Sequence, residues 1–209
     1  MAVVIKGSGI VEGIAVGGLP DGIVDTDMIA ANAVVTGKIT DGTIATADIA
    51  DSAVTAAKRG SGTILQVQGN LNTGGGTSTT TTDAWVSTYI TDTITPVALN
   101  SKIIVMCSNM AGYLGGSSSG YANATLGRNV NSEGWSYLGG GTNGMGYMYN
   151  IGGYSTSWYP VVTYLDTPTY TSGEAIVYTM FIRATSNATP CALGNGNCHS
   201  PIVLMEVSA

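Results

Sequence analysis

The sequence predicts an all-β chain in which a shaft built from a five-residue repeat precedes a C-terminal antiparallel β-sandwich, similar to a jelly roll. Two patterns support this fold class. Aliphatic residues recur at every fifth position of the N-terminal quarter, and short β-rich runs separated by turn residues fill the rest. The composition agrees, because only 10% of the residues are charged and 30 are glycine, whereas about a quarter of an average domain is charged.

The repeat comprises nine aliphatic residues spaced five apart: Ile14, Leu19, Val24, Ile29, Val34, Ile39, Ile44, Ile49 and Val54. In an α-helix a step of five residues turns about 500°, so these side chains would not share a face. In a flat strand an odd step moves each of them to the opposite face. The backbone must therefore turn a corner in every unit. Small or turn-forming residues, which suit corners, stand two positions before most of the nine aliphatic residues: Gly17, Gly22, Asp27, Asn32, Gly37, Gly42, Ala47 and Ser52.

Two architectures are compatible with such corners. The pattern resembles pentapeptide-repeat solenoids, but nine units would give little more than two coils of a four-sided solenoid, which is a small core for one chain. Three chains around a common axis would bury their aliphatic rows against one another, and we favour this arrangement. A low-complexity linker would not keep nine positions in register, and a coiled coil requires a heptad period instead.

The chain divides into a leader over residues 1–13, the shaft over 14–60 and a sandwich domain, the knob, over 61–209. Within the knob, alternating or apolar runs predict strands at 63–67, 84–90, 92–96, 102–107, 161–165, 174–183 and 201–207. Almost no helical periodicity interrupts them. Several short strands at this spacing are typical of sandwiches and jelly rolls.

Aromatic residues among Gly, Ser and Asn mark the candidate binding region, which lies between residues 110 and 160. This composition is typical of binding loops, where rigid rings stand beside adaptable hydrogen-bonding groups, and aromatic faces also stack on sugars. The candidate residues are Tyr113, Tyr121, Trp135, Tyr137, Tyr147, Tyr149, Tyr154 and Trp158. The alternative is that these rings fill a trimer interface or pack beneath loops.

The cysteines predict little chemistry. Cys107 lies in an apolar run and is expected to be buried, whereas Cys191 and Cys198 bracket a Gly-rich loop that a disulfide would close. His199 adds one metal ligand without a fourth candidate, so we expect no metal site and no cofactor.

We also expect no enzymatic activity. His199 has no identifiable acid to orient it for nucleophilic catalysis. A glycan-degrading site needs two positioned carboxylates, and the available acids, Glu133, Asp166 and Glu174, either belong to turns or lack a partner.

The net charge of −6 and a pI near 4.4 argue against nucleic-acid binding, which requires clustered Lys and Arg. The sequence contains no run of eighteen apolar residues, so it predicts no membrane insertion. The first residues do not form a signal peptide. A cytosolic protein or a virion component released by lysis fits this combination.

Several segments resemble fibre proteins of tailed bacteriophages, notably those infecting cyanobacteria: TDGTIATADIADSAVTAAK at 40–58, GSGTILQV at 60–67, YLDTP at 164–168, IVLMEV at 202–207, and the opening GSGI and GGLPD at 7–21. The resemblance implies a homotrimeric virion fibre without catalytic residues. It also implies that residues 1–13 dock onto another virion protein while the knob faces outward.

Three functions follow as expectations from this resemblance. The first is a tail fibre that attaches to a host-surface glycan or protein. The second is a fibre that decorates the capsid, and the third is a glycan-degrading tailspike. The protein would be assembled in the host cytoplasm and reside in the virion, on either tail or capsid.

Overall fold

The structure is a computed structural model that describes residues 4–5, 11–12, 18, 24, 26–72, 78–80, 83–108, 112–114, 119–141, 143–150, 156–159, 161–184, 191–193 and 200–209. The chain forms two compact units, Met1–Ala53 and Val54–Ala209. Among the described residues of the first unit, the leader contains an antiparallel pair formed by β1 (Val4–Ile5) and β2 (Val11–Glu12).

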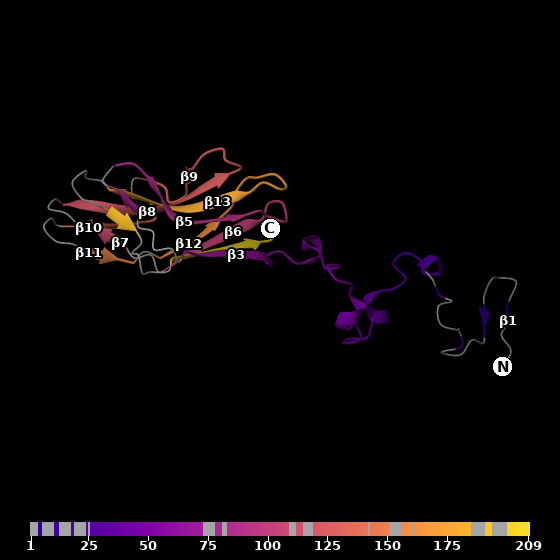
Figure 1. Cartoon of the computed structure of the whole chain (residues 1–209). Coiled ribbons are helices and arrows are strands. Elements are labelled where there is room, and N and C mark those ends of the chain that lie inside the picture. The colour runs from indigo at the N-terminus through magenta and orange to yellow at the C-terminus, as the bar shows by residue number, and fades with distance from the viewer. Residues whose placement is uncertain are drawn as a thin grey trace. The chain divides into compact units, whose positions relative to one another are not determined.

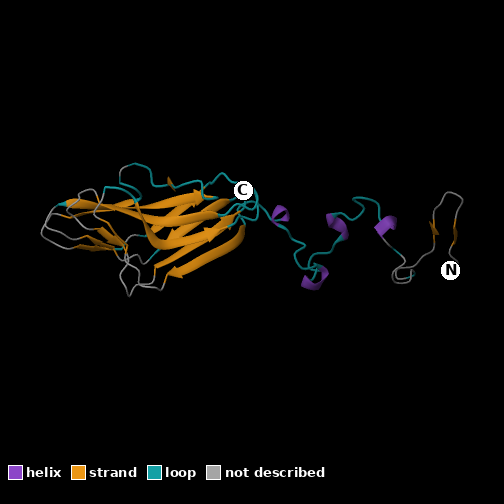
Figure 2. Ribbon diagram, turned by 45° about the horizontal axis from the view of Figure 1, so that its top comes forward, coloured by secondary structure: helices purple, strands orange, loops and turns teal. Residues whose placement is uncertain are grey.

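The shaft region is built from a structural repeat of ten residues, each with one short turn of 3₁₀-helix. Within each turn the hydrogen bonds span three residues, as when Lys38 N donates to the Val35 carbonyl (2.8 Å) and Ile39 N to the Thr36 carbonyl (3.1 Å). The turns are η1 (Thr26–Met28), η2 (Thr36–Lys38), η3 (Thr46–Asp48) and η4 (Ala56–Lys58), and Figure 2 shows them as short coils along the chain.

A second kind of turn lies between successive 3₁₀ turns, with a positive φ at its third residue. In one such turn Ala33 N donates to the Ala30 carbonyl (3.0 Å). The residues with positive φ are Asn32 (64°), Gly42 (77°), Ser52 (64°) and Gly62 (80°), a conformation that favours Gly and Asn. Each five-residue step thus turns a corner, but two kinds of corner alternate.

The aliphatic residues of the repeat are exposed in the single chain. Ile14 and Leu19 lie outside the described residues. The others, between 44% and 56% exposed, are Val24, Ile29, Val34, Ile39, Ile44, Ile49 and Val54. The hydrogen bonds of each turn are local, and the aliphatic side chains stay about half exposed. The described part of the shaft therefore has no core of its own.

The second unit is a sandwich of two antiparallel sheets (Figure 1). The first sheet has the order β12 (Val162–Asp166), β6 (Lys102–Cys107), β15 (Ser200–Val207) and β3 (Ile64–Asn72). The second has the order β10 (Gly146–Asn150), β8 (Gly120–Val130), β13 (Ile176–Ala184) and β5 (Val86–Ile94), and β9 (Ser136–Tyr137) pairs with β8. The prediction of an antiparallel β-sandwich is therefore confirmed.

Alternating side chains from both sheets form one core. Along β13, Ile176, Tyr178, Met180 and Ile182 point inward and are fully buried, as the two-residue period of a strand requires. They meet inward residues of the first sheet, including the predicted buried Cys107. Burial raises the thiol pKa of Cys107 to about 12, so this thiol stays protonated at alkaline pH values at which an exposed thiol ionises.

A small third sheet joins the connections between the two main sheets. Its order is β11 (Thr156–Trp158), β7 (Gly112–Leu114), β14 (Cys191–Leu193) and β4 (Ser78–Thr80). Each of these strands lies between a strand of one main sheet and the next strand of the other. In Figure 1, β7 and β11 lie at the end of the sandwich away from the C terminus.

A buried carboxylate, Glu206, anchors the connection between β5 and β6. It accepts hydrogen bonds from the Val97 (2.9 Å) and Ala98 (3.0 Å) amides, the Ser101 hydroxyl (2.7 Å) and the Gln66 side-chain amide (2.7 Å). At the same end of the knob, the last residues of the chain pair with the first residues of the knob, because Gly62 N donates to the Ser208 carbonyl (3.1 Å). The two ends of the knob sequence are thus fixed together.

The predicted strands mostly match those of the structure. The runs at 102–107 and 201–207 correspond to β6 and β15, whereas the runs at 84–90 and 92–96 belong to one continuous strand, β5. Sequence analysis missed the short strands and two long ones, β8 and β10, which lie in the region interpreted as binding loops. Among the described residues there is no α-helix.

Candidate functional site

Five of the predicted aromatic residues gather over the outer face of the second sheet. On β8, Ala122 and Ala124 belong to the core, so the alternate residues Tyr121 and Asn123 face outward. Tyr149 on β10 lies directly opposite Tyr121, and Tyr147 lies opposite Asn123. This register places three tyrosines on one patch of sheet rather than on separate loops.

The tyrosine cluster consists of Tyr121, Tyr147 and Tyr149. The Tyr121 ring lies 4.7 Å from the Tyr149 ring and 5.6 Å from the Tyr147 ring, centroid to centroid. The three side chains are nevertheless 39%, 57% and 48% exposed. Mutual packing fixes the rings, so binding would immobilise few side-chain rotamers, and their exposed area is accessible to a ligand.

The tryptophan cluster, formed by Trp85, Trp135, Tyr137 and Phe181, lies on the same outer face. Phe181 is buried beneath the rings of Trp135 (4.9 Å) and Tyr137 (5.1 Å), both packed edge to face. Gly127 makes this packing possible, because a Cβ there would stand 2.5 Å from Cε2 of Phe181. The two exposed rings of the cluster are Trp135 and Tyr137.

One edge of the tryptophan cluster carries positive charge. The guanidinium of Arg183 lies 4.9 Å from the centre of the Trp85 ring, within the range of a cation–π interaction, and its Nε is 3.4 Å from Asp83 Oδ1. The chain segment before β10 presses closely on the same ring. Gly144 has φ +65° and a Cβ there would lie 2.8 Å from Cη2 of Trp85.

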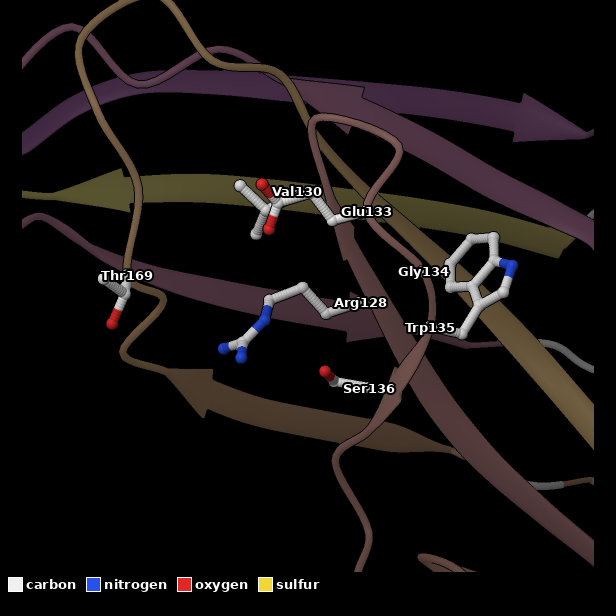
Figure 3. A pocket seen from close by; sticks show the side chains of 7 residues that line it. All are labelled: Arg128, Val130, Glu133, Gly134, Trp135, Ser136 and Thr169. Carbon is white, nitrogen blue, oxygen red and sulfur yellow. The ribbon is translucent and has the colours of Figure 1, made fainter.

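A polar pocket of about 330 Å³ opens beside Trp135. Figure 3 shows the Arg128 guanidinium between Thr169 on one side and Ser136 on the other. The remaining lining comes from the turn after β8, including Glu133 and Gly134, and from Val130. Hydroxyls, a carboxylate, a guanidinium and a neighbouring indole are groups that hold a hydroxyl-rich ligand such as a sugar.

Arg128 is fixed from beneath by the other sheet. Its Nη1 lies 2.8 Å from Oδ1 of Asp166, a buried residue of β12. The Tyr178 hydroxyl donates to Asp166 Oδ2 (2.7 Å). Burial, and then the neighbouring Asp166 carboxylate, raises the pKa of Tyr178 well above its ordinary value. Asp166 therefore compensates the Arg128 charge.

The other predicted aromatic residues do not join these clusters in the described structure. Tyr113 lies on β7 and Trp158 on β11, where Ser157 pairs with Tyr113, but their side chains are outside the described set. Tyr154 is also outside it. The predicted disulfide also involves atoms outside the described set. Cys191 lies on β14, in register with Thr80, and Cys198 falls outside the described residues.

Two of the three acidic residues weighed as catalytic groups have structural partners. Asp166 is held by Arg128 and Tyr178, and Glu174 accepts a hydrogen bond from the Thr171 amide (2.6 Å) within a turn. Glu133 lines the polar pocket. Over the described ranges no group of three His, Cys, Asp or Glu side chains could hold a metal ion, and no helix there is long and apolar enough to cross a membrane.

Sequence analysis missed Trp85, Phe181, Arg183, Arg128 and Thr169. Phe181 is a buried strand residue with no distinguishing pattern. Arg128 on β8 and Thr169 just after β12 come together only when the two sheets pack against each other. Trp85 carried a detectable signal, as an aromatic residue directly before an alternating strand, but it lies outside the aromatic-rich region.

Comparison of the chain with models of known protein families finds no match, and comparison with curated proteins finds none either.

Proposed function

We propose that the chain is a non-enzymatic virion fibre of a tailed bacteriophage, in which three copies form a shaft and present jelly-roll knobs that attach to the host surface. The observation that carries the proposal is the row of exposed aliphatic residues at every fifth shaft position. The leader, residues 1–13, would dock onto another virion protein. The sequence resemblance to phage fibres supports the same assignment.

The shaft argument is energetic. Each described aliphatic residue is about half exposed, so covering it would contribute on the order of 1 kcal/mol. A single extended chain gains none of this, and its ordered turns still cost conformational entropy. Three parallel copies would cover one another's rows at every step. In such a bundle each shaft segment would pack only against the identical segments of the other two copies. This explains why the five-residue spacing is regular over the whole shaft.

The knob argument rests on strand order. Of the eight long strands, the first pairs with the last (β3 with β15), the second with the seventh (β5 with β13), the third with the sixth (β6 with β12) and the fourth with the fifth (β8 with β10). A long hairpin rolled into two sheets produces this nesting, which supports a jelly roll.

The attachment argument rests on the two aromatic clusters and the pocket beside them. Exposed rings held by their neighbours, with hydroxyls and a charge-compensated arginine nearby, suit a host glycan or a protein surface. Of the three acidic residues weighed for glycan cleavage, Asp166 and Glu174 are used to hold the fold, which leaves Glu133 without a second carboxylate and favours a binding protein over a tailspike.

Light scattering of the full chain at micromolar concentration tests the assembly. We expect a mass of about 64 kDa, three times 21.2 kDa, and a monomeric mass would refute the fibre. Antibody labelling of intact particles then locates the protein: labelled tails support host attachment, and labelled capsids support the decorating fibre instead. Sustained release of reducing ends from host polysaccharide, abolished by Glu174→Gln, would point to the tailspike.

A further inference from the structure

The edge strand β3 of the first sheet has its polar and apolar sides reversed. Gln66 and Asn70 face the other sheet and donate hydrogen bonds to the carbonyls of Thr95 (2.7 Å) and Thr91 (3.1 Å). Val67 and Leu71 face outward and are 56% and 54% exposed. A strand that lies over a core with its outer side in water normally shows the opposite pattern.

The neighbouring strands extend this apolar outer face. On β15 the only acid, Glu206, points inward, and Val203 and Met205 point outward. The register aligns one outward residue from each strand of the first sheet into an uncharged row: Leu165, Ile104, Met205 and Val67. Met106 and Leu165 are, like Val67, exposed large apolar residues.

The apolar character of its edge strand distinguishes this face from the outer face of the second sheet. Among the outward positions of β3, β6, β12 and β15, Lys102 alone is charged. The corresponding side of β5 carries small hydroxyl residues, Ser87, Thr91 and Thr93. The two central strands, β6 and β15, are mostly apolar on both sides, which is typical of sheets covered on both sides. The first sheet is therefore suited to contact with another apolar surface.

We propose that the outer face of the first sheet is the contact surface between knobs of the three copies; this inference rests on the proposed trimeric shaft. The occupant is a second copy because β3 follows the last shaft turn directly in the sequence, so a trimeric shaft would bring the three copies of β3 close to one another. The last repeat residue, Val54, is exposed and belongs to the same compact unit, and β3 begins directly after the final turn, which is hydrogen-bonded to Ser208.

The size of the face agrees with a contact that needs the shaft. Four strands about 4.8 Å apart and about six residues of about 3.3 Å each give about 400 Å². This is about half of what each partner buries in a standard stable interface, but it equals the largest apolar patches on ordinary monomers, which are often functional. Tethering through the shaft raises the effective concentration enough for such a face to close.

Thiol labelling of the full chain tests the contact. Single cysteines are introduced by Val67→Cys or Leu165→Cys on the face, and by Thr93→Cys as the control. Thr93 is matched to Val67 because both are exposed, outward residues of edge strands. The mass of each variant is measured by light scattering, and maleimide labelling of the relevant peptide is followed by mass spectrometry, which separates it from the native cysteines.

In a trimer, we expect labelling at positions 67 and 165 to be at least about tenfold slower than at position 93, because interface cores pack as tightly as protein interiors. In denaturant all three rates should become equal. Equal rates in a molecule of trimeric mass would refute the knob contact and leave the shaft standing. A monomeric mass would refute both, and protection that arises only on adding lipid vesicles or host cells would assign the face to another partner.

Discussion

At the scale of single residues, Glu206 shows how one carboxylate organises a connection. It is fully buried and accepts hydrogen bonds from two backbone amides and two side chains. Glu206→Gln replaces one acceptor oxygen by a donor that faces other donors. We expect a loss of about 1–3 kcal/mol in the free energy of unfolding, measured by chemical denaturation. Glu133→Gln, the same change at an exposed carboxylate, is the control and should leave stability unchanged within about 0.5 kcal/mol.

Cys107 gives a residue-scale prediction about pH. Burial raises its thiol pKa from 9.0 to about 12, so the folded chain holds this proton more tightly than the unfolded chain does. The contribution of this proton to the free energy of unfolding is fully present below pH 9. It is lost as the pH rises toward 12, by at most about 1.4 kcal/mol per pH unit. The raised pKa of Tyr178 acts in the same direction.

Comparison of wild type with Cys107→Ala isolates the thiol. The variant should be less stable at pH 8, because its side chain leaves a small cavity, yet it should lose less free energy of unfolding between pH 8 and pH 10.5. Denaturation curves at the two pH values measure the difference. Equal losses in both proteins would show that Cys107 is not buried as described.

At the scale of elements, the two turns of the shaft repeat make opposite demands on glycine. Gly42 has φ +77°, whereas Gly37 lies in a 3₁₀ turn without a positive φ, and neither has an atom within 4 Å of a Cβ position. Gly42→Ala should lower shaft stability by about 1–2 kcal/mol, and Gly37→Ala should raise it by about 0.4–1 kcal/mol. Thermal melting of the full-length protein measures both, and equal effects would contradict the alternating turns.

The shaft also shows what sequence periodicity does and does not specify. The spacing of Ile29, Val34 and Ile39 predicted a corner in every unit, and each described unit has one. It did not distinguish the two kinds of corner, because both place an aliphatic residue two positions after the turn residue. The distinction lies in the backbone φ of Asn32 and Gly42, and short polar residues and glycines occupy both kinds of turn.

The missed strands have a different cause. β8 contains Gly120, Asn123, Thr125 and Gly127 and reads as a loop, because its outward side is covered by aromatic rings and a glycine-rich segment rather than by water. Its inward residues are the small Ala122 and Ala124, which give little hydrophobic alternation. Aromatic residues therefore located the candidate site in sequence, while the sheet on which they lie, and partners such as Trp85 and Phe181, depended on long-range pairing.

At the scale of the whole molecule, a shared shaft makes weak contacts effective. If three knobs are held together, each tyrosine cluster acts with two others, so that a small change per site is multiplied in attachment to a surface carrying many receptors. The same tether supports the contact proposed for the first sheet, which is too small to hold two free knobs together. Attachment and assembly are thus both expected to depend on the shaft.

Tyr147 provides the test of attachment at this scale. It is the most exposed ring of the tyrosine cluster, and a stacked aromatic contact contributes about 0.5–1.5 kcal/mol. We expect Tyr147→Ala to weaken binding to host cells by about twofold to tenfold per site, and by more for the intact trimer. Tyr147→Phe keeps the ring and should retain most of the binding. Cell-binding assays with labelled protein of verified trimeric mass measure the effect, and unchanged binding of Tyr147→Ala would exclude the tyrosine cluster as the attachment surface.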